Sequence, residues 1–168
     1  LYDNPSLTCR LPGLEKTSPI RVIVDRQLRT PLTSRLITTA QETPTWLFTD
    51  HTQDSSNYVK HGVKVFTLAP SGNNHHDLMN VLSQLADAGI NRLLVEGGSQ
   101  MITQCITEDI ADDIFWFQAP QILGDSSLAA IGSIYLPQLA DYPRYHQKRV
   151  TLFKNNDSIH QLTKKPKA

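Results

Sequence analysis

LLVEGGS, residues 93–99, is the stretch of this 168-residue sequence that says most about its fold. An apolar run ends there in a carboxylate, two glycines and a hydroxyl, and residues 100–106 have the pattern of a helix. A strand that enters a helix through Gly97-Gly98 lets a ligand approach bare backbone, and it directs the first free N–H groups of the helix toward an anion such as phosphate. Glu96, at the strand end, is placed to hydrogen-bond a neutral polar ligand. The same residues also suit a plain strand–helix connection with Ser99 as N-cap, and both interpretations remain open at this point.

Strands and helices alternate on both sides of this stretch. Apolar and β-branched runs predict strands over residues 19–25, 45–49, 62–68, 90–95 and 113–119, the last two buried on both faces. An apolar stripe at helical spacing predicts a helix that begins near Asp77 and ends at Gly89. Residues 26–43 suit a loop with a short helical turn, residues 70–74 are rich in turn formers, and residues 121–145 are loop-rich.

Two further strands, over residues 148–154 and 158–163, are predicted to form a hairpin through Asn155-Asn156-Asp157. Parallel strands joined by helices, followed by this hairpin, predict an α/β fold with a mixed, mostly parallel sheet and a C-terminal antiparallel hairpin.

Composition excludes several classes of function. Sixteen lysines and arginines balance sixteen aspartates and glutamates, which argues against broad binding to nucleic acid or to an anionic membrane. No run of 18 apolar residues and no signal peptide are visible, so we expect a cytoplasmic protein without a membrane span. Cys9 and Cys105 form no C-x-x-C pair and are expected to be reduced thiols, Cys105 on a packed helix face.

Other constellations are weaker. His75-His76 has no carboxylate or cysteine at ligand spacing, so no metal site is expected. The sequence has neither G-x-G-x-x-G nor a P-loop lysine, and Ser99 lacks the surroundings of a hydrolase nucleophile. Arginines gather near one predicted strand end, which suits either a phosphate or a solvated basic loop; they are Arg21, Arg26, Arg29 and Arg35.

Four ordered blocks carry a resemblance to a known family. They are D-N-P-x-L-T-x-R at residues 3–10, P-x-R-V-I-V-D-x-x-L-R-x-P at 19–31, V-E-G-G at 95–98 and A-P-x-I-L-G at 119–124. From Asp3 to about Thr163 the chain resembles the reductase domain of the bifunctional riboflavin biosynthesis deaminase/reductase. The resemblance implies a dihydrofolate-reductase-like fold, with helices flanking the mixed sheet. It also implies NADPH-dependent reduction of 5-amino-6-(5-phosphoribosylamino)uracil to the ribitylamino compound, with hydride delivered to the ring-opened sugar imine.

The resemblance also implies roles for particular residues. The substrate phosphate would be held by the backbone of Leu7 and by Arg10, and Glu96 would contact the substrate. Asp3 would contact the cofactor, as would the turn and helix start, which comprise Gly98, Ser99, Gln100, Met101, Ile102, Thr103 and Gln104. At Arg26 the family often has a serine that contacts the cofactor, and here the arginine would meet the 2′-phosphate instead. No catalytic acid follows from these residues.

The resemblance finally suggests how the chain is organised. We expect residues 1–163 to be a reductase domain that lacks the family's opening strand and helix, followed by a flexible basic tail over residues 164–168. A deaminase domain is expected upstream in the full protein, and a homo-oligomer is expected. Two alternatives remain: a non-catalytic dinucleotide-binding or assembly module, and a reductase of the same fold that acts on another phosphorylated pyrimidine or pterin-like substrate.

Overall fold

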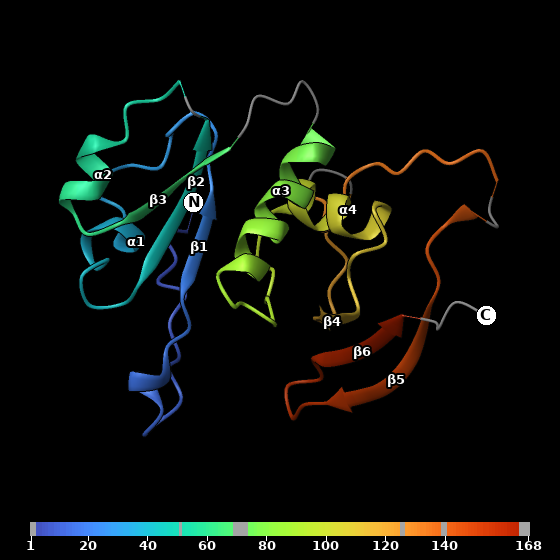
Figure 1. Cartoon of the computed structure of the whole chain (residues 1–168). Coiled ribbons are helices and arrows are strands. Elements are labelled where there is room, and N and C mark those ends of the chain that lie inside the picture. The colour runs from blue at the N-terminus through green and yellow to red at the C-terminus, as the bar shows by residue number, and fades with distance from the viewer. Residues whose placement is uncertain (1–2, 51, 69–73, 125–126, 139–140, 165–168) are drawn as a thin grey trace. The chain divides into compact units, whose positions relative to one another are not determined.

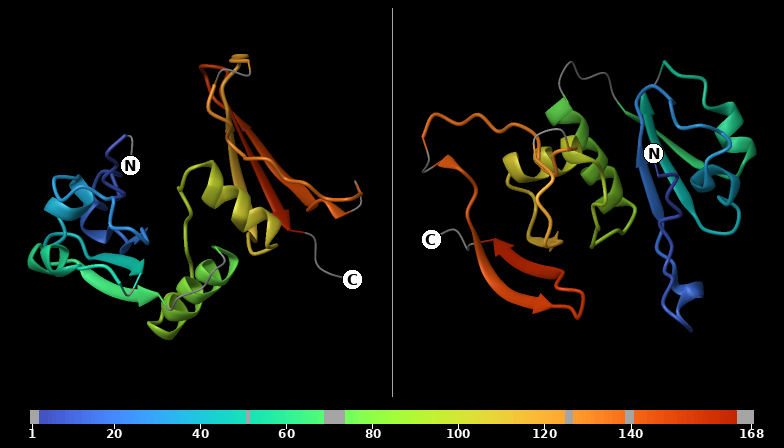
Figure 2. Two further views of the ribbon diagram at one scale, coloured as in Figure 1. Left: turned by 90° about the horizontal axis from the view of Figure 1, so that it is seen from above. Right: turned by 180° about the vertical axis from the view of Figure 1, so that it is seen from behind.

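The computed structural model describes residues 3–50, 52–68, 74–124, 127–138 and 141–164 of the chain. The chain divides into two compact units, residues 1–91 and 92–168, and each is described by itself. Figures 1 and 2 show the helices and strands of these units. Among the described residues, no helix is long and apolar enough to span a membrane.

Three parallel strands form the sheet of the first unit, in the order β1-β2-β3 (Figure 1). They are β1 (Arg21–Val24), β2 (Thr45–Asp50) and β3 (Lys64–Leu68). The short helices α1 (Arg35–Thr38) and α2 (Ser56–Lys60) lie in the connections, and a 3-10 turn, η1 (Glu15–Thr17), precedes β1. The three strands predicted in this part of the sequence are therefore confirmed, with small shifts at their ends.

Alternation along the strands places apolar side chains on both faces of this sheet. Ile23 and Leu47 face α1 and α2, where they pack with Ile37 and Tyr58. On the other face Phe48 and Phe66 stack at 4.6 Å between ring centroids, and α3 (Asn74–Asp87) covers them with Val81 and Leu85 (Figure 1). Parallel sheets are usually covered on both faces in this way.

The predicted helix before Gly89 is confirmed as α3, although it begins at Asn74 rather than near Asp77. Gly89 has φ +86°, a left-handed conformation that glycine adopts easily and that commonly ends a helix. The N–H of Ile90 then bonds back to the carbonyl of Leu85, which closes the last turn. The predicted loop at residues 70–74 lies almost wholly outside the described residues.

The second unit contains one helix and an antiparallel sheet with the strand order β4-β6-β5 (Figure 1). Its elements are α4 (Ser99–Thr107), β4 (Asp113–Gln118), β5 (Tyr145–Leu152) and β6 (Ser158–Lys164). The predicted hairpin is confirmed, and Asn156 turns it with φ +65°. Lys164, predicted to begin the tail, is the last residue of β6.

Two predictions about this part of the chain are wrong. Residues 90–95 form no strand, and Leu94 is 72% exposed. No described strand pairs with this segment, and an extended segment becomes a β-strand only when a neighbour supplies its hydrogen bonds.

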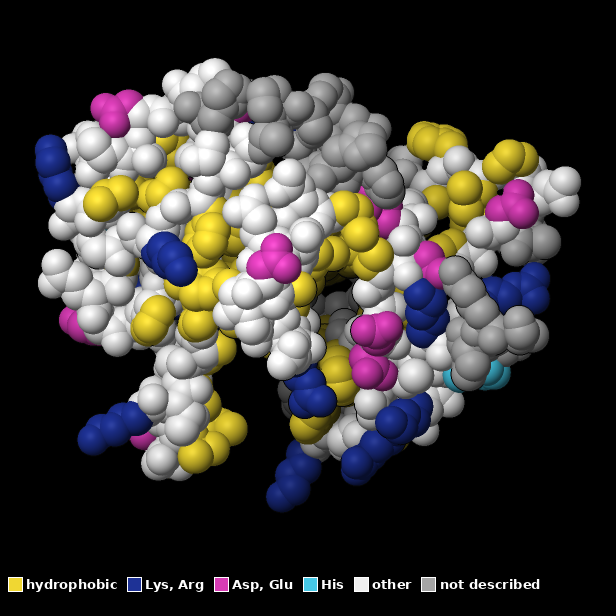
Figure 3. Space-filling view, viewed as in Figure 1, with side chains coloured by type: hydrophobic (Ala, Val, Ile, Leu, Met, Phe, Trp, Pro, Cys, Tyr) yellow, Lys and Arg dark blue, Asp and Glu magenta, His cyan; other side chains and the backbone are white. Residues whose placement is uncertain are grey.

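Strand β4 is present, but it is not buried on both faces. Phe115 and Phe117 share one face and are 53% and 72% exposed, whereas Ile114 and Trp116 on the other face are half-buried. Antiparallel sheets commonly carry a packed layer on one face only, so an apolar run does not guarantee two-sided burial. Figure 3 shows hydrophobic side chains at the surface of the molecule.

Candidate functional site

The loop over residues 3–10 is turned by two non-glycine residues in left-handed conformation. Asn4 has φ +44° and Leu7 has φ +48°. The Leu7 side chain packs against the core cluster that contains Ile23 and Leu36, so the backbone at residue 7 is fixed from inside. The N–H of Cys9 donates to Ser18 Oγ at 3.1 Å, which holds the end of the loop.

Arg10 and Asp3 are the exposed members of this loop that were predicted to contact ligands. Arg10 makes no hydrogen bond or ion pair with any of the residues that the structure describes. The loop thus presents a solvated guanidinium beside a rigid backbone turn. That combination suits a phosphate, because a guanidinium forms paired, charge-assisted hydrogen bonds with phosphate oxygens.

Arg21 was one of the four arginines that suited a phosphate, and the structure places it elsewhere. Its side chain is 2% exposed and donates only to protein oxygens, so no ligand reaches it. Burial lowers the pKa of Arg21, and the charge of Glu42 partly offsets this effect. The sequence places Arg21 in a predicted strand but does not show this role, because it does not tell whether the guanidinium meets protein oxygens or solvent.

Arg26 follows β1 and pairs with Asp50 at the end of β2, with 3.1 Å between Nη2 and Oδ2. The carboxyl ends of parallel strands are where ligands of open α/β sheets usually bind. A cofactor phosphate at Arg26 would therefore compete with Asp50 for the guanidinium.

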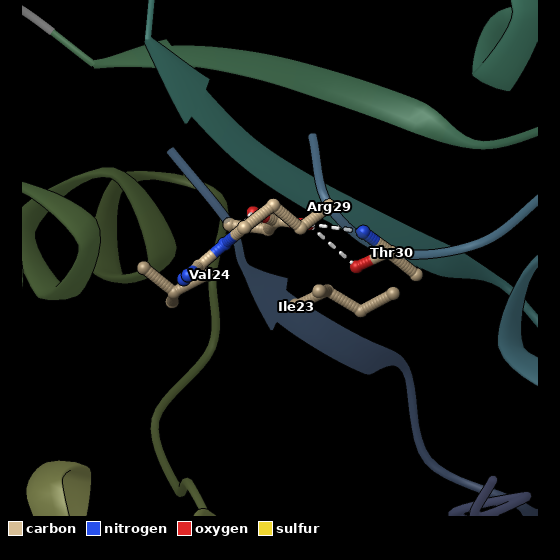
Figure 4. Close-up of a pocket in the computed structure, with 5 residues that line it drawn as sticks. Ile23, Val24, Arg29 and Thr30 are labelled. Carbon is tan, nitrogen blue, oxygen red and sulfur yellow. Dashed lines mark hydrogen bonds and ion pairs between the residues drawn. The ribbon is translucent and has the colours of Figure 1, made fainter. Parts of the chain in front are cut away.

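A pocket of about 350 Å³ lies beside this strand end, lined by Ile23, Val24, Asp25, Arg29 and Thr30 (Figure 4). Asp25 Oδ2 accepts hydrogen bonds from the N–H of Thr30 at 2.6 Å and from its hydroxyl at 2.7 Å. Burial by itself would raise the pKa of Asp25, but the bonds from Thr30 and the nearby backbone N–H groups outweigh it, and the net pKa is lowered. Asp25 is therefore an ionised group that fixes the wall of the pocket.

In the second unit, the Gly97-Gly98 turn leads directly into α4. Gly98 is the N-cap of this helix, with φ −67° and ψ 174°, and no side chain caps it. The alternative that Ser99 is the N-cap is therefore wrong, because Ser99 is already the first helical residue. A Cβ added to Gly98 would meet nothing within 4 Å, so its backbone is open to an approaching group.

The first turn of α4 is suited to an anion. The N–H of Ile102 bonds to the carbonyl of Gly98, and the N–H groups of the three residues before it have no partner within the helix. No acidic residue lies in this turn. Free N–H groups and the helix dipole together favour a phosphate at this position.

The later residues of the predicted cofactor segment are engaged within the protein. Thr103 donates its hydroxyl to the carbonyl of Ser99 and accepts the N–H of Gly132, both at 2.6 Å. Gln104 donates to Glu108 at 2.9 Å. Within α4, the open backbone therefore lies at its N-terminal end.

The candidate residues divide between the two units. Asp3, Leu7, Arg10 and Arg26 belong to the first, and the second contains Gly98–Gln104 together with Glu96, which is exposed. Glu96 does not end a strand, since residues 90–95 are not extended into a sheet. In the parts of the chain that the structure describes, no cluster of three His, Cys, Asp or Glu side chains could hold a metal ion.

Comparison with known proteins identifies the family. Residues 1–155 match the family model described as the RibD C-terminal domain. The chain belongs to this family. The resemblance inferred from the four sequence blocks is thereby confirmed.

Comparisons with individual proteins and with solved structures agree with this assignment. The riboflavin biosynthesis protein RibD of Aquifex aeolicus is 33% identical over 151 residues, which cover 89% of this chain and 40% of that protein. The 2,5-diamino-6-ribosylamino-4(3H)-pyrimidinone 5′-phosphate reductase of Archaeoglobus fulgidus is 30% identical over 146 residues, 81% of this chain and 65% of that one. The structure of Acinetobacter baumannii RibD has the same fold, with a TM-score of 0.77 at 22% identity over 98% of this chain and 44% of that chain. The chain spans less than two thirds of the length of each of these relatives.

Proposed function

We propose that this chain is the reductase part of a riboflavin biosynthesis protein. It reduces 5-amino-6-(5-phosphoribosylamino)uracil to 5-amino-6-(5-phosphoribitylamino)uracil, with NADPH as the reductant. The observation that carries the proposal is family membership over residues 1–155, joined to a relative named for a ribosylamino-pyrimidinone 5′-phosphate reductase. That name supports a phosphorylated ribosylamino-pyrimidine as the substrate class.

Loop 3–10 is the element that we assign to the substrate phosphate. The Leu7 backbone is fixed by its side chain in the core, and the Arg10 guanidinium is exposed. Together they offer an N–H donor and a cation to the phosphate oxygens. Glu96 is exposed and is assigned to the N–H groups of the substrate.

The start of α4 fits the diphosphate of a dinucleotide. Gly98 supports this fit, because the space beside its Cα is empty. That space borders N–H groups of the helix start that no side chain caps. Gly98, Ser99, Gln100 and Met101 would hold the diphosphate, with Ile102, Thr103 and Gln104 supporting this turn, and Asp3 and Arg26 are assigned to other parts of the cofactor. When bound, reduced nicotinamide supplies the hydride that the ring-opened sugar carbon accepts.

The experiment that tests the proposal uses the protein at its natural length. NADPH absorbance is followed with the phosphorylated substrate and with the same compound lacking its phosphate, and the product is identified by mass. We expect NADPH to be consumed one for one as the product gains two hydrogens, with a much lower kcat/KM for the dephosphorylated compound. If the phosphorylated substrate causes no NADPH oxidation, the proposed reaction is wrong. If both compounds react equally well, the phosphate assignment alone is wrong.

A further inference from the structure

The conformation of loop 3–10 is held by residues that do not themselves point to a ligand. Left-handed backbone is unfavourable for leucine, because the Cβ crowds the following carbonyl, whereas asparagine tolerates it better. Asn4 and Leu7 both adopt it, so the loop keeps this shape only if neighbouring contacts impose it.

Asn4 supplies the first of these contacts. Its Oδ1 accepts the N–H of Arg35, the first residue of α1, at 2.9 Å. The N-cap of that helix, Ser34, makes no side-chain capping bond, so Asn4 caps α1 in its place. One hydrogen bond therefore joins the loop to the helix that follows β1.

Arg21 supplies the second contact. Its Nη1 donates to the carbonyl of Ser6 at 3.2 Å, directly before the left-handed Leu7. Its other acceptors lie in residues 36–45: the hydroxyls of Thr39 and Thr45 and the carbonyls of Leu36, Thr39 and Thr43. A planar guanidinium that is fixed on so many sides sets the Ser6 carbonyl with little freedom.

We propose that Asn4 and Arg21 are positioning residues for the substrate phosphate. They fix the backbone on either side of residue 5, so that the Leu7 N–H and the Arg10 guanidinium are presented together. In this role Asn4 acts through its Oδ1, which accepts the N–H of Arg35, and Arg21 acts from a buried position that a phosphate does not reach. This inference rests on the proposed function, since the phosphate concerned belongs to the proposed substrate.

Three variants at the Asn4–Arg35 contact test the inference in the protein at its natural length. Asn4→Gly removes the acceptor but accepts φ +44° without strain, whereas Asn4→Asp keeps an acceptor oxygen. Arg35→Ala is the matched control, because it deletes an exposed side chain and keeps the N–H that Asn4 binds. A fourth variant, Arg21→Lys, keeps the charge and loses the planar fork.

We expect Asn4→Gly to weaken binding of D-ribose 5-phosphate by about tenfold or more, measured by calorimetry. The KM for the pyrimidine substrate should rise similarly, with kcat and NADPH affinity close to wild type. Amide hydrogen exchange over residues 6–10 should accelerate, while exchange in α3 stays unchanged. Arg21→Lys should act in the same direction, and Arg35→Ala should behave as wild type. Asn4→Asp should restore slow exchange; its added charge makes exchange, rather than affinity, the decisive measurement for that variant.

Each contrary result has a distinct meaning. If wild type binds ribose 5-phosphate and Asn4→Gly binds it equally well with unchanged exchange, the positioning role is wrong and the proposed function stands. If NADPH affinity and α3 exchange change as much as the loop does, the role is general stability rather than positioning, and the inference is overturned. If wild type neither binds ribose 5-phosphate nor distinguishes the phosphorylated substrate, the phosphate assignment is wrong, and the inference falls with it.

Discussion

Replacing Gly98 by valine tests whether the start of α4 binds the cofactor. The backbone there has φ −67° and ψ 174°, an extended conformation that a β-branched residue adopts freely. A Cβ at this position would meet no protein atom within 4 Å. The protein should therefore tolerate the side chain, and any loss of NADPH affinity would come from a clash between the valine and the bound cofactor.

The expected magnitude follows from what valine would block. Its two methyl groups would stand over the uncapped N–H groups and keep a diphosphate from their hydrogen-bonding distance. Losing one such charge-assisted bond costs roughly 1.5–3 kcal/mol, which corresponds to a tenfold to hundredfold weaker Kd. NADPH titration by calorimetry or fluorescence measures this change, with thermal unfolding recorded on the same samples.

Gly97 provides the matched control. A Cβ there would lie 2.9 Å from Met101 Cβ and 3.0 Å from its Cγ, so alanine would force the helix start to move. Gly97→Ala should thus lower the Tm through overpacking, at a cost of about 1–3 kcal/mol, whereas Gly98→Val should lower it less, through the poorer preference of valine for the N-cap position. A Gly98→Val protein with native Tm and native NADPH affinity would refute the placement of the cofactor at this turn.

Three further substitutions or modifications probe the first unit and the helix α4. Arg10→Ala should raise the KM for the phosphorylated substrate about tenfold or more and leave NADPH affinity unchanged; an equal rise for the dephosphorylated compound would contradict the assignment. Asp25→Asn should cost about 2 kcal/mol at neutral pH, because a neutral amide oxygen accepts the two bonds from Thr30 more weakly than a charged carboxylate oxygen does. The pKa of Asp25 in the folded protein is lowered from its usual 3.8. The stabilisation by ionised Asp25 is therefore present above pH 3.8 and disappears as the pH falls through the lower folded-state pKa. The free energy of unfolding in urea should differ between wild type and variant at pH 7 and become similar in acid. Burial, with a smaller effect of the Glu108 charge, raises the pKa of Cys105, so a thiol reagent should modify half-exposed Cys9 first and Cys105 only on unfolding; fast labelling of both would show that α4 is not packed as described.

Helical periodicity and β-branched runs were reliable guides to the elements of the first unit. Val81 and Leu85 fall on one helical stripe, and they are the residues through which α3 packs on the sheet. Residues 22–24 are a β-branched run, and they form most of β1, in which Ile23 belongs to the buried core of the first unit. Such patterns succeed because side-chain size and polarity are properties of the sequence itself.

Predictions that depended on a partner were less secure. From the sequence, Arg21 was expected either to bind a phosphate or to lie in a solvated loop. In the structure its acceptors are backbone carbonyls and threonine hydroxyls up to 24 residues away. Backbone carbonyls are present in every chain and threonine is common, so no motif marks these acceptors. The Gly97-Gly98 turn shows the same limit, because only the structure separates Gly97, which packs against Met101, from Gly98, which faces open space.

A substitution of Leu94 can measure how far the burial predicted from the sequence departs from the burial in the structure. The sequence predicts that it lies in a strand buried on both faces, whereas in the structure it is 72% exposed and outside any sheet. Truncating a buried leucine or isoleucine to alanine costs about 2–5 kcal/mol, but truncating an exposed one usually changes stability by less than about 0.5 kcal/mol. In the 168-residue chain, Leu94→Ala should therefore be nearly neutral in urea unfolding, whereas Ile106→Ala, in the same unit and 7% exposed, should lose the larger amount. Equal losses at the two positions would mean that residues 90–95 are packed as the sequence predicts. A neutral Leu94→Ala would mean that an apolar run, even beside a Gly-Gly turn, is not necessarily buried as a strand.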